Sequence, residues 1–289
     1  MRFVFMCIEA NNAPALRQAA AAIEREHGLR LVIDFFTPPD MHSTTDWERL
    51  AAAIARADFV FGSMLFGEEY VRPLSDLLAK ASCPVCMIMS SPSLIKQTRI
   101  GKFDLRPKPA TEQSAFRQWL SQFQPKHGHG EIQRQMALVR GLSNVLKFLP
   151  GKARDIHTYV MAHQFWAAST PENLRRLLLM LIERYVPGYK GKLPVLDPQQ
   201  IPEIGAFHPD APEPFAALAA YRAWRRKQRH RFSSGTVGLL TMRPFALSGN
   251  RAHLDALIRA LEARGIEARA AYSPTLDMRA TVERFFTDP

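Results

Sequence analysis

The chain has 289 residues, of which 47% are hydrophobic and 22% are charged. This length accommodates about two domains of ordinary size, and the balance of residues excludes a disordered chain. The formal net charge is +11, from 38 Lys and Arg against 27 Asp and Glu. Such an excess favours an acidic partner, so nucleic acid, an anionic membrane surface and a ligand carrying carboxylates all stay open.

The cysteines and the N-terminus indicate the compartment. Three cysteines, Cys7, Cys83 and Cys86, are too few for a disulfide framework and suggest a reducing environment. The apolar start of the chain is not followed by a small-residue cleavage site, so no signal peptide is predicted. No window reaches the roughly 18 uninterrupted apolar residues of a membrane span. We therefore expect a soluble, cytoplasmic protein with no transmembrane segment.

Strands and helices are predicted to alternate at the start of the chain. The apolar spacing of Leu16, Ala19 and Ile23, stopped by Gly28, is typical of a helix. Similar patterns predict strands at residues 2–8, 29–36, 58–64 and 84–89, and helices at 13–27, 46–57 and 68–81. Such alternation indicates βαβ units, and the fold class is therefore α/β, with an open, mostly parallel, doubly wound sheet.

A mainly helical connector and the start of a second α/β unit are predicted to follow. Helices are expected at 112–123, 132–148, 152–168, 171–185 and 215–229, with an irregular stretch at 187–214. A strand at 236–241, a helix at 250–264, a strand at 266–271 and a helix from 281 come next. Two strands cannot form a stable sheet alone, so this last unit is expected to be incomplete. The predicted domains are 1–110, 111–234 and 235–289.

Two cysteines and two histidine pairs are possible chemical groups. Cys83 and Cys86 form a CxxC pair, but it opens an apolar strand and lacks a second pair, which favours buried structural thiols. His127 and His129 lie between glycines, and a hinge is the better interpretation than a metal site. His157 and His163 are six residues apart on one predicted helix, so they do not share a face. Their aromatic neighbours are interpreted as core more readily than as a tetrapyrrole site.

A polar rim at the strand ends is a weak candidate site, because open α/β sheets bind ligands there. Helix starts and solvated turns are the favoured interpretation of the same residues. The basic run at 222–231 is interpreted as a solvated helix face. No HExxH, P-loop, GxSxG or GxGxxG motif is present, so no catalytic or metal site is predicted. The rim candidates are Glu68, Glu69, Lys96, Arg99 and Lys102.

Four stretches in a fixed order carry a family resemblance. Residues 58–69 join an apolar strand to a Phe-Gly-Glu-Glu turn, and residues 89–103 contain Met-Ser followed by Lys-Gln-Thr-Arg-Ile-Gly-Lys-Phe. Residues 149–209 contain Leu-Pro-Gly, Gln-Phe-Trp, Glu-Asn, Tyr-Val-Pro and His-Pro. Residues 235–289 start with Gly-Thr-Val-Gly-Leu and end in Val-Glu-Arg-Phe-Phe-Thr-Asp-Pro. Together they resemble the N-terminal portion of the H subunit of magnesium chelatase, in the superfamily of the cobaltochelatase large subunit.

The resemblance implies a part in chlorophyll or bacteriochlorophyll biosynthesis. The complete subunit of that family binds protoporphyrin IX, and a AAA+ ATPase subunit and a third subunit drive the ATP-dependent insertion of Mg²⁺. The first two stretches favour magnesium over cobalt. For this chain the resemblance implies a structural or regulatory role, without a cofactor or catalytic residue of its own and without activity alone. The alternatives are an autonomous tetrapyrrole-binding module and, with no recognised motif behind it, a basic nucleic-acid-binding protein.

Overall fold

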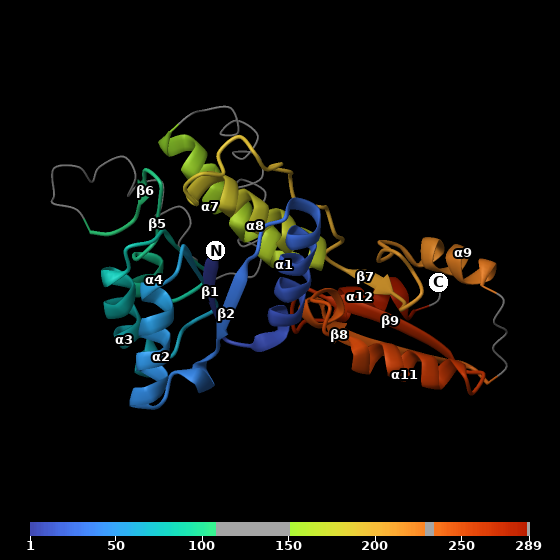
Figure 1. Cartoon of the computed structure of the whole chain (residues 1–289). Helices are drawn as coiled ribbons and strands as arrows, with labels where there is room; N and C mark the ends of the chain where they lie inside the picture. The colour runs from blue at the N-terminus through green and yellow to red at the C-terminus, as the bar shows by residue number, and fades with distance from the viewer. Residues whose placement is uncertain (108–150, 229–233, 288–289) are drawn as a thin grey trace. The chain divides into compact units, whose positions relative to one another are not determined.

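A computed structural model describes residues 1–107, 151–228 and 234–287 of the chain (Figure 1). Two units are distinguished. The first contains residues 1–10, 20–164 and 176–197, and the second contains residues 11–19, 165–175 and 198–289. The helices expected at 112–123 and 132–148, and the hinge at His127 and His129, lie outside the described residues. The domain boundaries at 110 and 234 stay predictions.

The sheet of the first unit has the predicted parallel core. Its strands run in the order β2-β1-β3-β4-β5-β6, and the first four are parallel. An antiparallel hairpin, which the sequence did not predict, extends it beyond β4. The bounds are β1 Arg2–Cys7, β2 Val32–Phe36, β3 Phe59–Ser63, β4 Val85–Ile88, β5 Arg99–Ile100 and β6 Phe103–Asp104.

Helices cover both faces of this sheet, which explains why β3 and β4 are buried along their whole length. Helices α2 (Thr44–Ala55) and α3 (Glu68–Lys80) pack on the face that carries Val4, Val60 and Met87. On the opposite face, the ring of Tyr185 lies 5.9 Å from that of Phe59. Tyr185 ends α8 (Pro171–Tyr185). Figure 1 shows α2 and α3 together on one side of β1.

Helix boundaries follow local capping. Helix α1 (Ala13–His27) and helix α8 begin and end where the sequence predicted, and α7 (Lys152–Ala167) ends one residue early. Helix α2 begins two residues before the predicted start, because Ser43 caps it: its Oγ accepts from the Asp46 N–H at 3.2 Å. Short helical turns, which periodicity does not reveal, are η1 Ala10–Asn12, η2 Pro38–Asp40 and α4 Pro92–Ile95.

The second unit contains a sheet of three strands, in the order β7-β9-β8. Strands β8 (Thr236–Met242) and β9 (Glu267–Ser273) are parallel, as predicted, and β7 (Gly205–Phe207) is antiparallel to β9. The prediction of only two strands, and of an irregular stretch throughout 187–214, was therefore wrong. Three residues are too short for a recognisable period, and β7 depends on long-range pairing with β9.

Helices lie on both faces of this second sheet as well. Helices α10 (Arg243–Leu247) and α11 (Ala252–Glu262) contribute to a core with Phe207, Leu239 and Ala270. Helices α9 (Leu218–Lys227) and α12 (Arg279–Phe285) contribute to the opposite core with Ala271. The turn at α10 was not predicted, although Pro244 in its first turn favours a helix start. Throughout the described ranges, no helix combines the length and apolarity that crossing a membrane requires.

Candidate functional site

The carboxyl ends of β1 and β3 form the point where the first sheet reverses its strand order. From β1 the chain crosses to β2 on one side, and it then returns to β3 and β4 on the other. Doubly wound sheets bind ligands at such a switch point, outside the carboxyl ends of the strands. In this chain Ile8 follows β1, Met64 follows β3 and Met89 follows β4. These strand ends define the candidate site.

Two methionines at this edge have an uncommon backbone conformation. Met64 has a φ of 58° and Met89 a φ of 45°, in the left-handed region that bulky side chains rarely adopt. The two residues are joined, because the Met64 N–H donates to the Met89 carbonyl at 3.0 Å. Backbone strain of this kind costs about 1–3 kcal/mol per residue and persists only where neighbouring bonds enforce it.

Ser90 supplies those neighbouring bonds. Its buried Oγ accepts from the Leu65 N–H at 3.2 Å and donates to the Ile88 carbonyl at 2.9 Å. The Ser91 N–H also donates to the Leu65 carbonyl at 2.8 Å. These hydrogen bonds hold the ends of β3 and β4 together. The surface formed at the strand ends by Ile8, Met64 and Phe66 is called the ledge below.

The ledge presents apolar side chains to the surface. Ile8 is 41% exposed, Met64 40% and Phe66 55%, and these are the exposed large apolar residues between positions 1 and 107. Their gathering at the switch point marks an apolar contact surface, since exposed apolar patches commonly indicate binding. The sequence did not reveal it, because each residue follows a buried strand and resembles core.

The five predicted rim residues are separated by the structure. Glu68 and Glu69 are exposed in the first turn of α3, and Lys96 is exposed at the end of α4. Arg99 pairs with Val85, at the amino end of β4, because β5 runs antiparallel. Lys102 lies beyond Arg99 in the hairpin. Placing Arg99 and Lys102 on the carboxyl edge was therefore wrong, since the prediction did not include an antiparallel strand.

Arg99 has a structural role instead. Its guanidinium donates to the carbonyl of Leu78 at 2.9 Å and to that of Ala81, at the C-terminal end of α3. Burial lowers the pKa of Arg99 from its ordinary value. A cation at the end of a helix satisfies carbonyls that have no partner within the helix.

The segment 96–103, which carries part of the family resemblance, is also architectural. The Thr98 hydroxyl accepts from the Met87 N–H at 3.0 Å, which anchors the hairpin to β4. Gly101 has a φ of +58°, and a Cβ there would overlap the carboxylate of Asp155. That carboxylate accepts from the Lys102 N–H at 2.7 Å and from the Tyr185 hydroxyl at 3.0 Å. The glycine is therefore required by backbone conformation and by close packing together.

The cysteine pair and the histidines of α7 are buried groups. Cys83 is 8% exposed and Cys86 fully buried, and burial raises the pKa of both thiols. His163 stacks edge-on against Tyr159 at 4.9 Å, and burial lowers its pKa to about 4. His157 is 2% exposed. Across the described ranges, no three His, Cys, Asp or Glu side chains gather as metal ligands would.

One buried ionic network was missed by sequence reasoning. In the second unit, the Glu262 carboxylate accepts from His208 Nε2 at 3.1 Å and from the Arg225 guanidinium. His208 Nδ1 accepts from the Asp210 N–H at 3.1 Å, which places the ring proton on Nε2. Burial is the largest influence on His208 and lowers its pKa. The ring of Trp224 lies 4.9 Å from that of His208.

A signal for this network does exist in the sequence. Arg225 follows Tyr221 by four residues in α9, and Glu262 follows Ile258 by four in α11, so each charge lies on an apolar stripe. Opposite charges on two apolar stripes suggest a buried pair. The interpretation of residues 222–231 as a solvated face was wrong for Arg225, whose side chain is 8% exposed.

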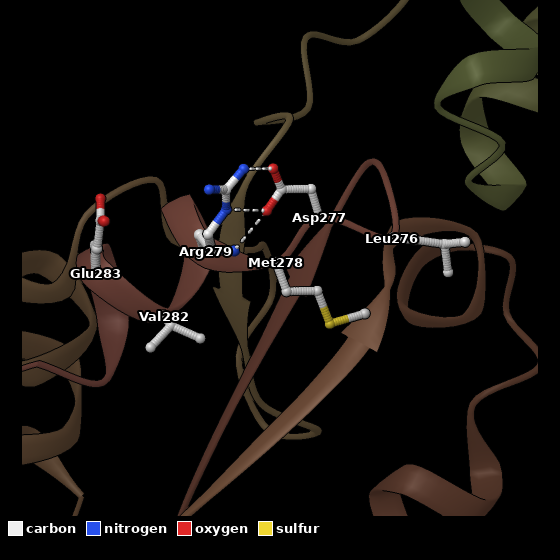
Figure 2. Close-up of a pocket in the computed structure, with 6 residues that line it drawn as sticks. All are labelled: Leu276, Asp277, Met278, Arg279, Val282 and Glu283. Carbon is white, nitrogen blue, oxygen red and sulfur yellow. Dashed lines mark hydrogen bonds and ion pairs between the residues drawn. The ribbon is translucent and has the colours of Figure 1, made fainter. Parts of the chain in front are cut away.

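The second unit also contains an open hollow at the carboxyl end of β9, shown in Figure 2. Its volume is about 510 Å³. Arg279 and Asp277 face one another in it: the Arg279 guanidinium donates to the Asp277 carboxylate at 2.9 and 2.6 Å, and the Arg279 backbone N–H donates to it at 3.2 Å. The Arg279 guanidinium is therefore already engaged by a carboxylate of the same hollow. It is lined by Leu276, Asp277, Met278, Arg279, Val282 and Glu283.

The geometry thus defines an α/β protein with an exposed apolar ledge at its strand ends and, among the described residues, buried charges such as Arg225 and Glu262 in structural contacts. A family model described as "Domain of unknown function (DUF3479)" matches residues 2–160, and one described as "CobN/Magnesium Chelatase" matches residues 163–289. The chain belongs to the DUF3479 family, whose model covers more than half of its residues.

The resemblance to H subunits of magnesium chelatase is confirmed. The magnesium-chelatase H subunit of Cereibacter sphaeroides is 30% identical over 95% of this chain and 23% of its own length. The chloroplastic magnesium-chelatase protein ChlH of Oryza sativa subsp. indica is 26% identical over 100% of this chain and 22% of its own. The chain therefore spans less than a quarter of the length of these relatives.

A solved structure is also similar to the chain. It is that of the catalytic subunit of cobaltochelatase from Mycobacterium tuberculosis, and it aligns with 98% of this chain and 17% of its own. The TM-score is 0.48 and the identity 16%, so the assignment of the α/β fold depends on the strand order described above.

Proposed function

We propose that the chain acts as the N-terminal part of the porphyrin-binding H subunit of a magnesium chelatase, which inserts Mg²⁺ into protoporphyrin IX for chlorophyll or bacteriochlorophyll synthesis. The observation that supports this is the match of 95% of the chain to the magnesium-chelatase H subunit of Cereibacter sphaeroides. The match of residues 163–289 to the family model described as "CobN/Magnesium Chelatase" supports it as well.

Within such a subunit the chain has a structural or regulatory role. Metal insertion requires a base for the pyrrole protons and oxygen or nitrogen ligands that strip water from Mg²⁺. The buried charged groups of the described residues are instead engaged in structural contacts, as Glu262 is with Arg225. The ledge at Ile8, Met64 and Phe66 is suited to contact with a neighbouring polypeptide. The proposed partners are the AAA+ ATPase subunit and the third chelatase subunit.

The test is a reconstituted chelatase reaction. The chain, or the complete H subunit of Cereibacter sphaeroides as a positive control, is mixed with both smaller subunits, ATP, Mg²⁺ and protoporphyrin IX. Fluorescence of the magnesium porphyrin is then recorded. We expect no magnesium porphyrin when the chain replaces the complete H subunit in this mixture. Sustained formation of magnesium porphyrin there would contradict the proposed role.

A competition experiment tests the proposed partners. Excess chain is added to the complete, working reaction, and it should slow the rate by occupying the contact surface of a smaller subunit. The matched variant Phe66→Ser should slow it less, because Phe66 is the most exposed apolar side chain of the ledge. An unchanged rate at every excess of chain would exclude such a contact. Saturable quenching of protoporphyrin fluorescence by the chain would instead support the tetrapyrrole-binding alternative.

A further inference from the structure

We propose that the outer edge of β8 is an interface at which two copies of the chain pair, strand against strand. The inference concerns the second unit and does not depend on the proposed function. It starts from the order β7-β9-β8, which places β8 at one side of the sheet (Figure 1). On that outer side, β8 has no backbone partner among the described residues.

The other sheet edges are protected. On the far side of β7, Ala206 and Phe215 exchange two backbone hydrogen bonds, at 2.9 and 2.8 Å. In the first unit, the edge strand β2 carries Asp34, which is ion-paired with Arg2 at 2.5 Å. The opposite edge strand there, β6, has two residues. Covering, charge and shortness are the usual devices that stop sheet edges from pairing with other chains.

Strand β8 carries none of these devices. It has seven residues, Thr-Val-Gly-Leu-Leu-Thr-Met, with no charge and no proline. Val237 is 38% exposed and Leu240 41%. Since Leu239 packs into the core beside α11, alternation places Val237 on that face and Leu240 on the opposite one. At this edge an apolar side chain is therefore partly exposed on each face of the sheet, and an added strand could cover both.

A second copy fits this edge because β8 is complementary to itself. In an antiparallel pair centred on Leu239, Gly238 of each copy lies opposite Leu240 of the other. The ring of Phe286 lies over Gly238, so each leucine meets an apolar surface. No like charges meet within the strand, and the twofold symmetry gives each copy the same contacts. Main-chain hydrogen bonds supply affinity, and the alternating side chains set the register.

The mass of the intact chain in solution tests this. Light scattering after gel filtration, over a series of protein concentrations, should show a rise from 32.7 kDa towards twice that mass. Leu240→Lys should raise the dissociation constant of the dimer by about a hundredfold or more, because an unpaired ammonium is costly to bury. Leu276→Lys is the matched control, since Leu276 is 82% exposed and lies outside β8.

Val237→Lys provides a second variant on the other face, with the same expected loss of dimer. Circular dichroism of each variant checks that the fold is retained. A wild-type chain that stays monomeric at every concentration would overturn the proposal, as would a dimer that both lysine variants on β8 leave intact. Dissociation by Leu276→Lys would also overturn it, because the interface would then lie elsewhere.

Discussion

Replacing Glu262 by Gln should strongly destabilise the second unit. The side chains of Glu262 and Arg225 are 9% and 8% exposed, and that of His208 is 1% exposed. The carboxylate is the common acceptor for both neighbours. Gln keeps the shape but removes the charge and directs an amide N–H₂ towards two donors. Arg225 then stays buried without its counter-ion.

The magnitude follows from that burial. Removing one partner of a buried ion pair costs about 3–5 kcal/mol, because the remaining charge has lost its hydration without compensation. An exposed ion pair, between Arg259 of the same helix α11 and Asp210 in the segment after β7, serves as a control. Arg259 and Asp210 are 56% and 51% exposed and lie 2.8 Å apart. Arg259→Gln should therefore cost only about 0.2–1 kcal/mol.

Urea unfolding followed by circular dichroism measures the difference. In the unfolding transition of the second unit, Glu262→Gln should lower the midpoint urea concentration several times more than Arg259→Gln does. The double variant Arg225→Met with Glu262→Leu should recover part of the loss, because no ionic group is then left unpaired. Equal midpoints for Glu262→Gln and Arg259→Gln would refute the argument that this network is a desolvated ion pair.

Three further predictions concern the first unit. Gly101→Ala should lower the midpoint of urea unfolding by more than Gly28→Ala, since both have positive φ but only Gly101 lies against a carboxylate. The unfolding free energy should fall by about 2 kcal/mol from pH 7 to pH 5 through His163, whose folded pKa is below the unfolded value, and His163→Phe should remove this component. Cys83 and Cys86 should resist iodoacetamide until urea unfolds the chain, as mass spectrometry would show.

The sequence predicted correctly those helices whose ends are fixed by neighbouring residues. Helix α8 begins at Pro171 after the Thr170 hydroxyl, which accepts from the Asn173 N–H at 3.1 Å, and both cues are in the sequence. Strand β7 was missed because its support is distant: the Tyr272 hydroxyl lies against Gly205, where a Cβ would come within 2.6 Å of it. Such a contact has no period along the chain.

The candidate site was only partly predictable for the same reason. Glu68, Glu69 and Lys96 were expected near the carboxyl ends of the strands, where helices follow parallel strands. Arg99 was misplaced because a two-residue antiparallel strand reverses the direction of the chain. The left-handed backbone conformation of Met64 could not be predicted either, because methionine has no preference for it. The bond that holds this backbone comes from Ser90, which contacts Leu65 from 25 residues further along the chain.

Three arginines show why part of the basic excess behind the net charge of +11 is not open to a nucleic acid. Arg99 donates to carbonyls at the end of α3, and Arg225 pairs with Glu262. Arg243 donates to the carbonyls of Ala167 and Ile201, at 2.7 and 3.0 Å. A guanidinium in such a position is engaged in holding the backbone and cannot neutralise a phosphate without breaking the fold. Phosphate binding should therefore be sought only among exposed cations such as Arg226 and Lys227, and a shallow salt dependence of nucleic-acid affinity is the expected result.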